Sequence, residues 1–410
     1  MNDATLVNLS VCSARPNPLG ALARRLVFAQ LSSLACGQLR VRETDAVHDF
    51  GAAPGLSAEI HVQDPAFFAE TAFGGSVGAA ESYMLGHWRA DDLTMLMRLL
   101  LRNRASLDGL ERGLARASAP LRGIAHWLHR NTRAGSRRNI AAHYDLGNEF
   151  FRLMLDESMM YSCAFFERPG MALAAAQEAK LDRICRALAL EPGDHVLEIG
   201  TGWGGFAMHA AGRYGCRVTT TTISPSQFEL ARERVRSAGL ESRVTLLLED
   251  YRDLRGTYDK MVSIEMIEAI GHRQYGEFFR QAAARLAPRG RMLLQAITIA
   301  DHLYAGARDS VDFVKRYVFP GACIPAVSAL AQAMARNSDL RILSLEDIGP
   351  HYATTLAGWR ANFFANVDRV RALGYPESFI RLWEYYLCYC EAGFAEGTLG
   401  DAQILLARAG

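Results

Sequence analysis

From residue 173 onward, short apolar runs alternate with amphipathic segments of helical length. The apolar runs predict strands at 194–199, 216–222, 243–248, 259–264 and 290–298. The intervening segments predict helices at 204–214, 226–238 and 272–287, and a further helix at 173–189 precedes the first strand. Repeated strand–helix units with short connections are typical of a parallel sheet covered by helices on both faces, which binds ligands at the carboxyl ends of its strands.

The pattern is less regular on either side of this block. After it, we expect helices at 308–318 and 326–337, a strand at 340–346, helices at 352–370 and 376–394, and a last strand at 401–407. Before it, a helix at 21–34, short stretches around 58–62 and 64–69, and amphipathic helices over 81–101 predict a small mixed domain. The predicted organisation is a flexible N-terminus (1–17), an accessory domain (18–110), a basic linker (111–139) and a catalytic domain (140–410).

Composition is that of an ordinary globular protein. The 410 residues are 50% hydrophobic with a net charge of +1, which argues against a basic nucleic-acid-binding protein. No apolar run has the length of a membrane span, and the first residues do not resemble a signal peptide, so we expect a cytoplasmic protein. The eight cysteines form neither a C-x-x-C pair nor a zinc-binding spacing, and we interpret them as reduced thiols in a chain without a metal site.

The basic linker has two interpretations. Seven arginines and no carboxylate lie between Arg112 and Tyr144, together with Trp127 and Leu128. Such a run is usually a solvated connection between domains. It could also hold the protein on anionic phospholipid, since a basic residue near such a surface contributes about 1 kcal/mol.

A glycine-rich turn follows the first predicted strand, in the segment DHVLEIGTGWGG. Gly200 and Gly202 would let the backbone approach a ligand closely, and Glu198 lies two residues ahead of the first glycine. The next strand ends in RVTTTT, without the acidic residue that a nicotinamide dinucleotide site needs for its ribose. The segment therefore favours S-adenosylmethionine (SAM) over NAD and predicts a Rossmann-like α/β fold of the class I SAM-dependent methyltransferases.

Polar residues after consecutive strands complete the predicted cofactor site. Thr222 and Gln227 stand where neutral groups can bind ribose hydroxyls, and Asp250 and Tyr251 follow the third strand, near the expected adenine position. Each alone could equally be a cap or turn residue. The predicted cofactor-binding residues are Tyr161, Ser162, Glu198, Gly200, Gly202, Thr222, Ile223, Gln227, Asp250 and Tyr251.

An aromatic segment, AHYDLGNEFFRLMLDESMMYSCAFF, lies just before the parallel sheet. Its apolar residues could be ordinary core. They could equally line an apolar tunnel that ends at a methyl donor, where Tyr144 or Tyr161 would stabilise positive charge by a cation–π contact worth about 0.5 to 2 kcal/mol.

Six motifs in order carry a family resemblance: HYDLGNEFF, YSCAFF, VLEIGTGWGGFA, SIEMIEAIGHRQY, RYVFPGACIP and GPHY. On these motifs, the chain from about residue 140 to its end resembles the cyclopropane-fatty-acyl-phospholipid synthase and mycolic acid cyclopropane synthase family. The earlier segment ESYMLGHW looks like the accessory domain of the phospholipid-acting members, which is thought to present lipid and mediate dimerisation.

The resemblance implies a reaction and a catalytic site. A cis double bond of an acyl chain would attack the sulfonium methyl, and a base, thought to be bound bicarbonate in this family, would remove a proton so that the ring closes. The implied bicarbonate site consists of Cys163, acting through its backbone, Glu268, Ile297 and Tyr352, with Glu346 as the partner of the tyrosine. Taken without the resemblance, Cys163 could be a small buried thiol and Glu268 a residue near a helix N-terminus.

The chain departs from the family pattern at one position of this site. Where the family has histidine in L-L-H-T-I, this chain has Gln295 in LLQAI, and Ala269 replaces a second histidine. A glutamine can donate a hydrogen bond but cannot titrate. The departure leaves methyl transfer intact and bears on how the proton leaves and which product forms.

The function that we expect is therefore SAM-dependent formation of cyclopropane rings on unsaturated acyl chains of membrane phospholipids. Alternatives are methyl transfer that ends in a methyl or methylene branch, reaction on another alkene, and a catalytically silent protein that binds SAM or lipid. The expected partners are phospholipid acyl chains at the inner face of the membrane, where the protein would associate peripherally, and a second copy in a homodimer.

Overall fold

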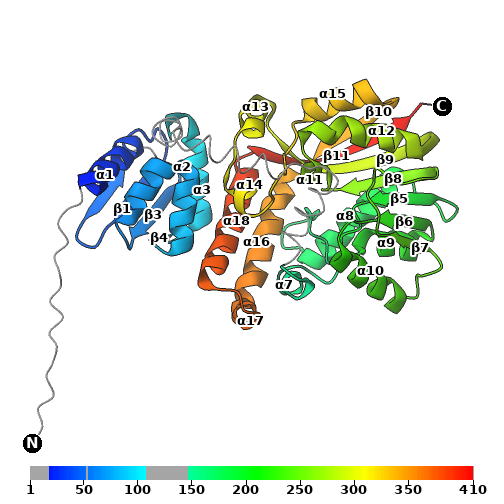
Figure 1. Cartoon of the computed structure of the whole chain (residues 1–410), viewed down its shortest axis with the longest axis horizontal. Coiled ribbons are helices and arrows are strands. Elements are labelled where there is room, and N and C mark those ends of the chain that lie inside the picture. The colour runs from blue at the N-terminus through cyan, green and yellow to red at the C-terminus, as the bar shows by residue number, and fades with distance from the viewer. Residues whose placement is uncertain (1–17, 52–53, 108–145, 410) are drawn as a thin grey trace, which may run out of the picture.

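The structure is a computed structural model that describes residues 18–51, 54–107 and 146–409. The predicted flexible N-terminus (1–17), the basic linker (111–139) and Tyr144 lie outside the described residues. The described chain forms a four-stranded sheet near the N-terminus and a seven-stranded sheet beyond it, with two long helices, α16 and α18, between them (Figure 1).

Within the described residues, the N-terminal unit consists of three helices and four strands. Its elements are α1 (Pro18–Leu31), β1 (Gln38–Arg42), β2 (Val47–Phe50), β3 (Ser57–Val62), α2 (Ala66–Leu85), β4 (Trp88–Ala90) and α3 (Leu93–Arg102), and the strand order is β2-β1-β3-β4. The prediction of helices throughout 81–101 is wrong, because β4 interrupts them. Gly86 adopts φ +82° and ends α2, and Asp92 begins α3 by accepting a hydrogen bond from the Met95 amide.

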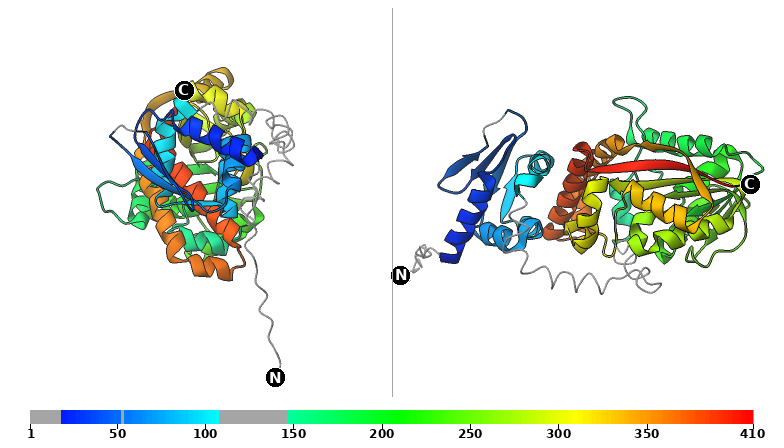
Figure 2. Two further views of the ribbon diagram at one scale, coloured as in Figure 1. Left: turned by 90° about the vertical axis from the view of Figure 1, so that its left-hand side faces the viewer. Right: turned by 90° about the horizontal axis from the view of Figure 1, so that it is seen from above.

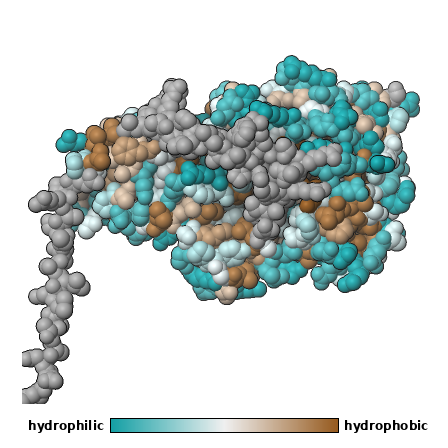
Figure 3. Space-filling model, in the orientation of Figure 1, coloured by the Kyte–Doolittle hydropathy of each residue, from teal (hydrophilic) through white to brown (hydrophobic). Residues whose placement is uncertain are grey.

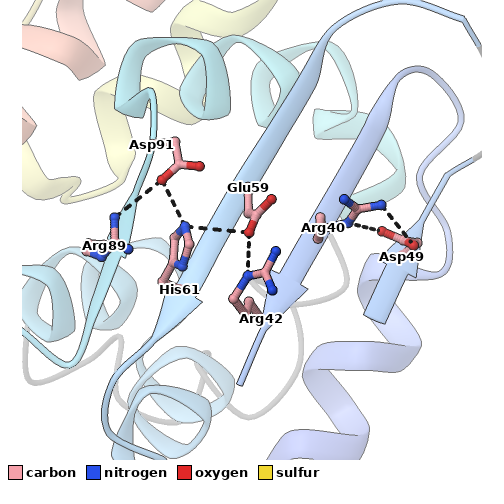
Figure 4. A network of polar contacts seen from close by, with 7 residues as sticks. All are labelled: Arg40, Arg42, Asp49, Glu59, His61, Arg89 and Asp91. Carbon is pink, nitrogen blue, oxygen red and sulfur yellow. Dashed lines mark hydrogen bonds and ion pairs between the residues drawn. The ribbon is translucent and has the colours of Figure 1, made fainter. Parts of the chain in front are cut away.

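One face of this sheet carries a network of charged side chains (Figure 4). Cross-strand pairs join Arg40 to Asp49 and Arg42 to Glu59, each at 2.7 Å, and His61 lies 2.8 Å from Asp91. Solvent screens exposed pairs of this kind, so they add little to the stability of the fold. Glu59, His61 and Asp91 also have ligand atoms within 4.8 Å of one another, but they are paired with each other and with neighbouring arginines, so we assign no ion to them.

The seven-stranded sheet has the order β10-β11-β9-β8-β5-β6-β7. Its strands are β5 (His195–Ile199), β6 (Arg217–Thr221), β7 (Val244–Leu247), β8 (Tyr258–Ile264), β9 (Leu286–Ile299), β10 (Leu340–Asp347) and β11 (Leu399–Arg408). Neighbours are parallel except at β11, which runs antiparallel to both β9 and β10. The chain leaves β5 toward β6 on one side and later returns to β8 on the other, so a ligand crevice is expected at the carboxyl end of β5.

Helices cover both faces of this sheet, as Figure 2 shows from above. On one face lie α8 (Leu173–Leu188), α9 (Gly205–His209) with the π-helical turn Ala210–Tyr214, and α10 (Pro225–Ser237); on the other lie α11 (Ile267–Ile270), the 3₁₀ turn His272–Gln274, α12 (Tyr275–Arg285) and α15 (Val327–Asn337). Successive strand residues point to opposite faces. Val196 accordingly packs with the first group of helices and Leu197 with the second.

The remaining helices connect the seven-stranded sheet to the N-terminal unit. They are α7 (Asn148–Met154), α13 (Asp301–Asp309), α14 (Phe313–Tyr317), α16 (Gly349–Ala365), α17 (Val367–Ala372) and α18 (Glu377–Ala395). The predicted single helices at 308–318 and 352–370 are each two helices. One continuous apolar core joins Phe68 and Trp88 of the N-terminal unit to Phe150 of α7 and Trp383 of α18.

The molecular surface has few extended apolar areas on the face that Figure 3 shows, where hydrophilic side chains surround separate brown patches. In α1, Leu19, Leu22 and Leu26 are exposed and recur at helical spacing along one side. Among the described residues, no helix combines the length and the apolar character needed to cross a bilayer.

Candidate active site

The glycine-rich turn leaves β5 at the predicted crevice. Gly200 and Gly202 adopt φ +104° and +52°, a region that side-chain-bearing residues rarely enter. The amides of Gly200 and Thr201 both donate to the Thr221 carbonyl, at 3.1 and 3.0 Å, so that the turn is fixed to the end of β6. No described atom lies within 4 Å of the point where a Cβ on Gly202 would stand. The turn therefore leaves open space beside its backbone.

Glu198 lies under this turn, buried within β5. The Thr220 hydroxyl donates to its Oε2 at 2.6 Å and lies 2.7 Å from the Thr201 hydroxyl. Burial raises the pKa of Glu198 to about 8, and the hydrogen bond from Thr220 only partly opposes this shift. The carboxyl group is consequently neutral at neutral pH unless a cation approaches it.

Thr222 and Gln227 meet where β6 passes into α10. The Thr222 hydroxyl donates to the side-chain oxygen Oε1 of Gln227 at 2.9 Å. Ser224 caps the start of α10, because its hydroxyl accepts a hydrogen bond from the backbone amide of Gln227. Ile223, between them, is half-buried. The predicted ribose-binding pair is thus held together at the carboxyl end of the strand next to β5.

The residues after β7 have other contacts. Asp250 is buried, and Arg252 donates to both of its carboxylate oxygens, at 2.8 and 2.6 Å. The Tyr251 ring packs edge-on against Phe278 at 5.9 Å, and its buried hydroxyl has no hydrogen-bond partner among the described residues. Burial raises the pKa of Tyr251, which stays a neutral phenol.

These features fit SAM. The open backbone at Gly202, the neutral pair Thr222–Gln227 and the polar residues after β7 follow three adjacent strands, and each supplies a group suited to one part of an adenosyl amino acid. Bound there, SAM would supply an electrophilic methyl group.

A second polar cluster lies at the carboxyl ends of β8 and β9. At its centre is Glu265, which directly follows β8. Its Oε1 accepts from the Cys163 backbone amide at 2.8 Å and from Gln295 Nε2 at 2.9 Å, and its Oε2 accepts from the Tyr352 hydroxyl at 2.6 Å. Three of the predicted catalytic residues thus come together on a carboxylate that the sequence analysis did not single out.

Glu268 and Ile297 form a second contact nearby. The Ile297 backbone amide donates to Glu268 Oε1 at 2.5 Å, and Glu268 Oε2 is buried without a partner among the described residues. Burial and, to a smaller extent, the charge of Glu265 together raise the pKa of Glu268 to about 8. Glu268 is therefore expected to be protonated at neutral pH when Glu265 is ionised.

Gln295 links Glu265 to a third acid, Asp401. Its Nε2 also donates to Asp401 Oδ2 at 2.8 Å, while its Oε1 accepts from Gln403 at 3.1 Å. Burial and the neighbouring carboxylates raise the pKa of Asp401 well above its usual range. Lys180, buried on α8 and donating to the Ser162 hydroxyl at 2.6 Å, is the cation whose charge lowers the pKa of Glu265.

Aromatic rings surround Tyr352 in this cluster. Its ring stacks on Phe394 at 4.4 Å and packs edge-on against Trp359 at 5.9 Å. Tyr161, whose ring lies 5.1 Å from Trp359, shares a 2.9 Å hydrogen bond with the hydroxyl of Tyr386. Aromatic faces attract cations, so this environment suits a reaction that develops positive charge.

The predicted role of Glu346 is wrong. Tyr352 donates to Glu265. Glu346 lies on β10 with its side chain 56% exposed and forms an ion pair with Arg183 of α8. No pattern in the sequence indicates which face of β10 Glu346 occupies.

The described residues do not fit a bound bicarbonate at the predicted position. The Cys163 amide and the Tyr352 hydroxyl, which would donate to the anion, both donate to Glu265, and the Ile297 amide donates to Glu268. An anion there would also face the ionised carboxylate of Glu265, and like charges at close range destabilise one another. We therefore derive no step through bicarbonate.

The sequence analysis missed Glu265, Lys180 and Asp401. Glu265 could have been found, because a carboxylate immediately after a buried parallel strand lies at the ligand-binding edge of the sheet. Lys180 and Asp401 carry no such signal, since each belongs to an otherwise ordinary helix or strand.

The order of the strands, the turn after β5 and the residues beside it define a Rossmann-like, class I SAM-dependent methyltransferase. Comparison with known proteins narrows this class. The family described as mycolic acid cyclopropane synthetase matches residues 131–404, well over half of the chain. The chain belongs to this family.

Relatives and solved structures agree with that assignment. The tuberculostearic acid methyltransferase UfaA1 of Mycobacterium tuberculosis is 40% identical over 355 residues, 82% of this chain and 80% of that protein. The cyclopropane-fatty-acyl-phospholipid synthase of Escherichia coli K12 is 37% identical over 364 residues, 87% and 89% of the two chains. The structure of mycolic acid cyclopropane synthase CmaA1 with SAH and CTAB is 32% identical and superposes with a TM-score of 0.62, covering 66% of this chain and 98% of that one.

Proposed function

We propose that this enzyme transfers a one-carbon unit from SAM to the cis double bond of an acyl chain carried by a membrane phospholipid, and that the product is a cyclopropane ring. The observation that carries the proposal is the position of the Glu265–Tyr352 pair within an aromatic wall. Methylation of an alkene leaves a carbocation on the acyl chain. To close this cation to a ring, the site needs aromatic faces that stabilise the positive charge and a base that removes one proton.

The relatives support the substrate class. Two of them are named as acting on fatty acyl groups, one as a cyclopropane-fatty-acyl-phospholipid synthase that is similar over most of both chains. A chain that shares this family and retains Tyr352, Glu268 and the SAM turn has the groups that an acyl-chain reaction needs.

The second candidate is a methylene or methyl branch in place of the ring. It is favoured by Gln295, which stands where the family has histidine and which cannot titrate. The relative at 40% identity, named a methyltransferase, supports it as well. For the methylene branch, a hydride shift along the acyl chain precedes loss of a proton from the transferred carbon, so the ring and the methylene branch start from the same cation. A saturated methyl branch would need a hydride donor in a later step.

The test is identification of the product. The purified protein is incubated with methyl-labelled SAM and vesicles of cis-unsaturated phospholipid, and the acyl chains are examined by mass spectrometry and proton NMR. Cyclopropyl protons are expected; olefinic methylene protons would instead favour the second candidate. A protein that binds SAM but labels no lipid would contradict both.

We also propose that the protein works at the membrane surface and as a homodimer. The acyl chain has to be drawn from a bilayer, and the exposed leucines of α1 offer an apolar stripe. Helix α1 lies in the N-terminal unit, at the end of the molecule opposite the seven-stranded sheet (Figure 1). Co-sedimentation with anionic vesicles tests association with the membrane. Leu22→Glu should reduce co-sedimentation, and unchanged binding would contradict the role of α1.

Sedimentation equilibrium tests the proposed homodimer, and a monomer at micromolar concentration would contradict it.

A further inference from the structure

Glu265 takes up the donors that the family resemblance assigns to a separate anion. A backbone amide, a phenol and a side-chain amide all donate to its two oxygens within 2.6 to 2.9 Å. Cys163, Gln295 and Tyr352 come from three distant segments of the chain, and their common target is this one carboxylate. The cradle is therefore built around a group of the protein itself.

The backbone at Glu265 supports a functional interpretation. It adopts φ +47°, in the left-handed region where glycine is favoured and a long side chain is uncommon. Strained residues of this kind persist where the surrounding structure holds them, and they cluster at active sites. Glycine would fit this position without strain, yet the chain carries a carboxylate here.

The hydrogen-bond donors of the cluster select Glu265 as its ionised acid. It accepts three hydrogen bonds, whereas Glu268 accepts one and retains an unpartnered buried oxygen among the described residues. Burial raises the pKa of Glu265 above its usual value, and the hydrogen bonds from Tyr352, Cys163 and Gln295 and the charge of Lys180 oppose that rise. Burial and the neighbouring carboxylates also raise the pKa of Asp401 well above its usual range, and Asp401, like Glu268, keeps one buried oxygen without a partner among the described residues. The three donors on Glu265 therefore favour this acid as the one that carries the negative charge of the cluster.

We propose that the Glu265 carboxylate is the base of the reaction and replaces a bound anion such as bicarbonate. This inference rests on the proposed function, because it assigns the proton acceptor of that reaction. The double bond of the acyl chain forms a carbon–carbon bond to the methyl carbon as the carbon–sulfur bond breaks with its electron pair on sulfur. A C–H bond of the transferred carbon then breaks, its electron pair forms the third bond of the ring, and the proton goes to Glu265.

The same base serves the branched product. After a hydride shift, the C–H electron pair of the transferred carbon forms a double bond, and the proton again goes to Glu265. Tyr352 and Gln295 act as positioning residues, because they hold the two carboxylate oxygens. The proton leaves to solvent before the next turnover, so that acyl chain and SAM yield product, S-adenosylhomocysteine and one proton.

The first test measures anion binding and needs no lipid. Carbon-13-labelled bicarbonate is titrated into the full-length wild type and into Glu265→Gly, and binding is followed by carbon NMR. Glycine suits the φ of this position and removes the carboxylate that occupies the cradle. We expect saturable binding to Glu265→Gly and none to the wild type. Saturable binding of bicarbonate to the wild type would overturn the proposal, because it would show that the Glu265 carboxylate does not exclude the anion.

The second test measures turnover in buffer freed of carbon dioxide. Wild-type turnover should not change when bicarbonate is added. Glu265→Gln, which keeps the size of the side chain, should lower turnover by about 100-fold or more while SAM affinity stays within a few-fold, in the range for a positioned base. In Glu265→Gly, turnover should be at least about ten-fold faster with added bicarbonate or formate than without it. Glu277→Gln on the exposed side of α12 is the matched control and should behave as wild type.

The results separate this inference from the proposed function. A wild type that stops without bicarbonate, or a Glu265→Gln variant at full rate, would overturn Glu265 as the base while leaving acyl-chain chemistry in place. If the wild type transfers no label to any unsaturated lipid, the proposed function fails, and the binding titration alone decides whether Glu265 or an anion occupies the cradle. Circular dichroism of both variants establishes that a lost rate is not lost folding.

Discussion

At the scale of single residues, the chemistry depends on which of three clustered acids is ionised. Glu265, Glu268 and Asp401 are all subject to burial, which disfavours their charged forms. Only Glu265 is surrounded by donors. The hydrogen bond from Tyr352 is therefore a determinant of where the negative charge resides, and its removal should be measurable as a change in titration.

Tyr352→Phe should lower turnover by about 10- to 100-fold, since a hydrogen bond to a charged group contributes about 1.5 to 3 kcal/mol. Loss of the donor raises the pKa of Glu265, so the acidic limb of the pH profile of kcat/KM should move to higher pH. Tyr275→Phe, which removes a buried hydroxyl that donates to the Cys323 carbonyl, is the control and should leave the profile in place. An unmoved limb in Tyr352→Phe would show that the phenol does not act through Glu265.

Glu346→Gln should leave turnover within two-fold of wild type, because this residue pairs with Arg183 at the surface and does not touch Tyr352. Steady-state kinetics on labelled SAM measure this directly. A loss of ten-fold or more would restore Glu346 to the catalytic site.

At the scale of secondary-structure elements, α18 connects the two parts of the molecule. Its apolar side belongs to the core shared with the N-terminal unit, and its polar side carries three cross-links. Tyr83 of α2 donates to Glu384 at 2.6 Å, and Thr94 of α3 donates to Glu391 at 3.3 Å. Arg98 and Arg102 of α3 both donate to Glu396, the residue that directly follows α18. The same helix supplies Tyr386 to the aromatic wall, so the N-terminal unit is packed directly behind the candidate active site.

Glu396→Ala should loosen the contact between α3 and α18. The carboxylate of Glu396 is largely buried between two half-exposed arginines. Because solvent screens these pairs, the change should lower the free energy of unfolding by only about 1 kcal/mol. Hydrogen exchange of α3 amides should become faster while that of the seven-stranded sheet does not change. Glu377→Ala, which breaks an exposed pair with Arg371, is the control. Equal exchange in α3 before and after the Glu396 change would contradict this role.

The elements were more predictable than the site. Parallel strands buried on both faces have dense apolar sequences, so each strand of the seven-stranded sheet and most of its helices could be predicted to within a few residues. β4 was missed because three residues are too few to show a period. Cys163, Tyr352 and Gln295 were recognised from motifs, but their meeting on Glu265 depends on the register of three distant segments, which no local pattern contains.

At the scale of the whole molecule, buried acids make folding dependent on pH. Glu198 and Glu268 have pKa values of about 8 in the folded chain, against 4.5 for the exposed group. Between these values the folded state binds more protons than the unfolded state, so the stability that each acid contributes is complete below pH 4.5 and is lost as pH rises toward 8. The cluster at the active site thus lowers stability under the conditions in which the enzyme works.

Glu198→Gln should therefore gain stability relative to wild type as pH rises from 5 to 8. For one proton, the difference in free energy of unfolding between variant and wild type changes by at most about 1.4 kcal/mol per pH unit. Thermal unfolding at several pH values measures the difference between the two midpoints. Glu277→Gln should show no such trend in this range, because Arg280 lowers the pKa of Glu277 and the group is ionised throughout. A difference that does not grow with pH would contradict a buried, protonated Glu198.

The central claim is that a carboxylate of the protein removes a proton from the transferred carbon on an acyl chain. The most direct measurement uses SAM with a trideuterated methyl group and vesicles of cis-unsaturated phospholipid, in buffer freed of bicarbonate, and counts deuterium in the acyl product by mass spectrometry. The account predicts one added carbon that carries two deuterium atoms. An added carbon that retains all three, or no transfer until bicarbonate is supplied, would contradict it.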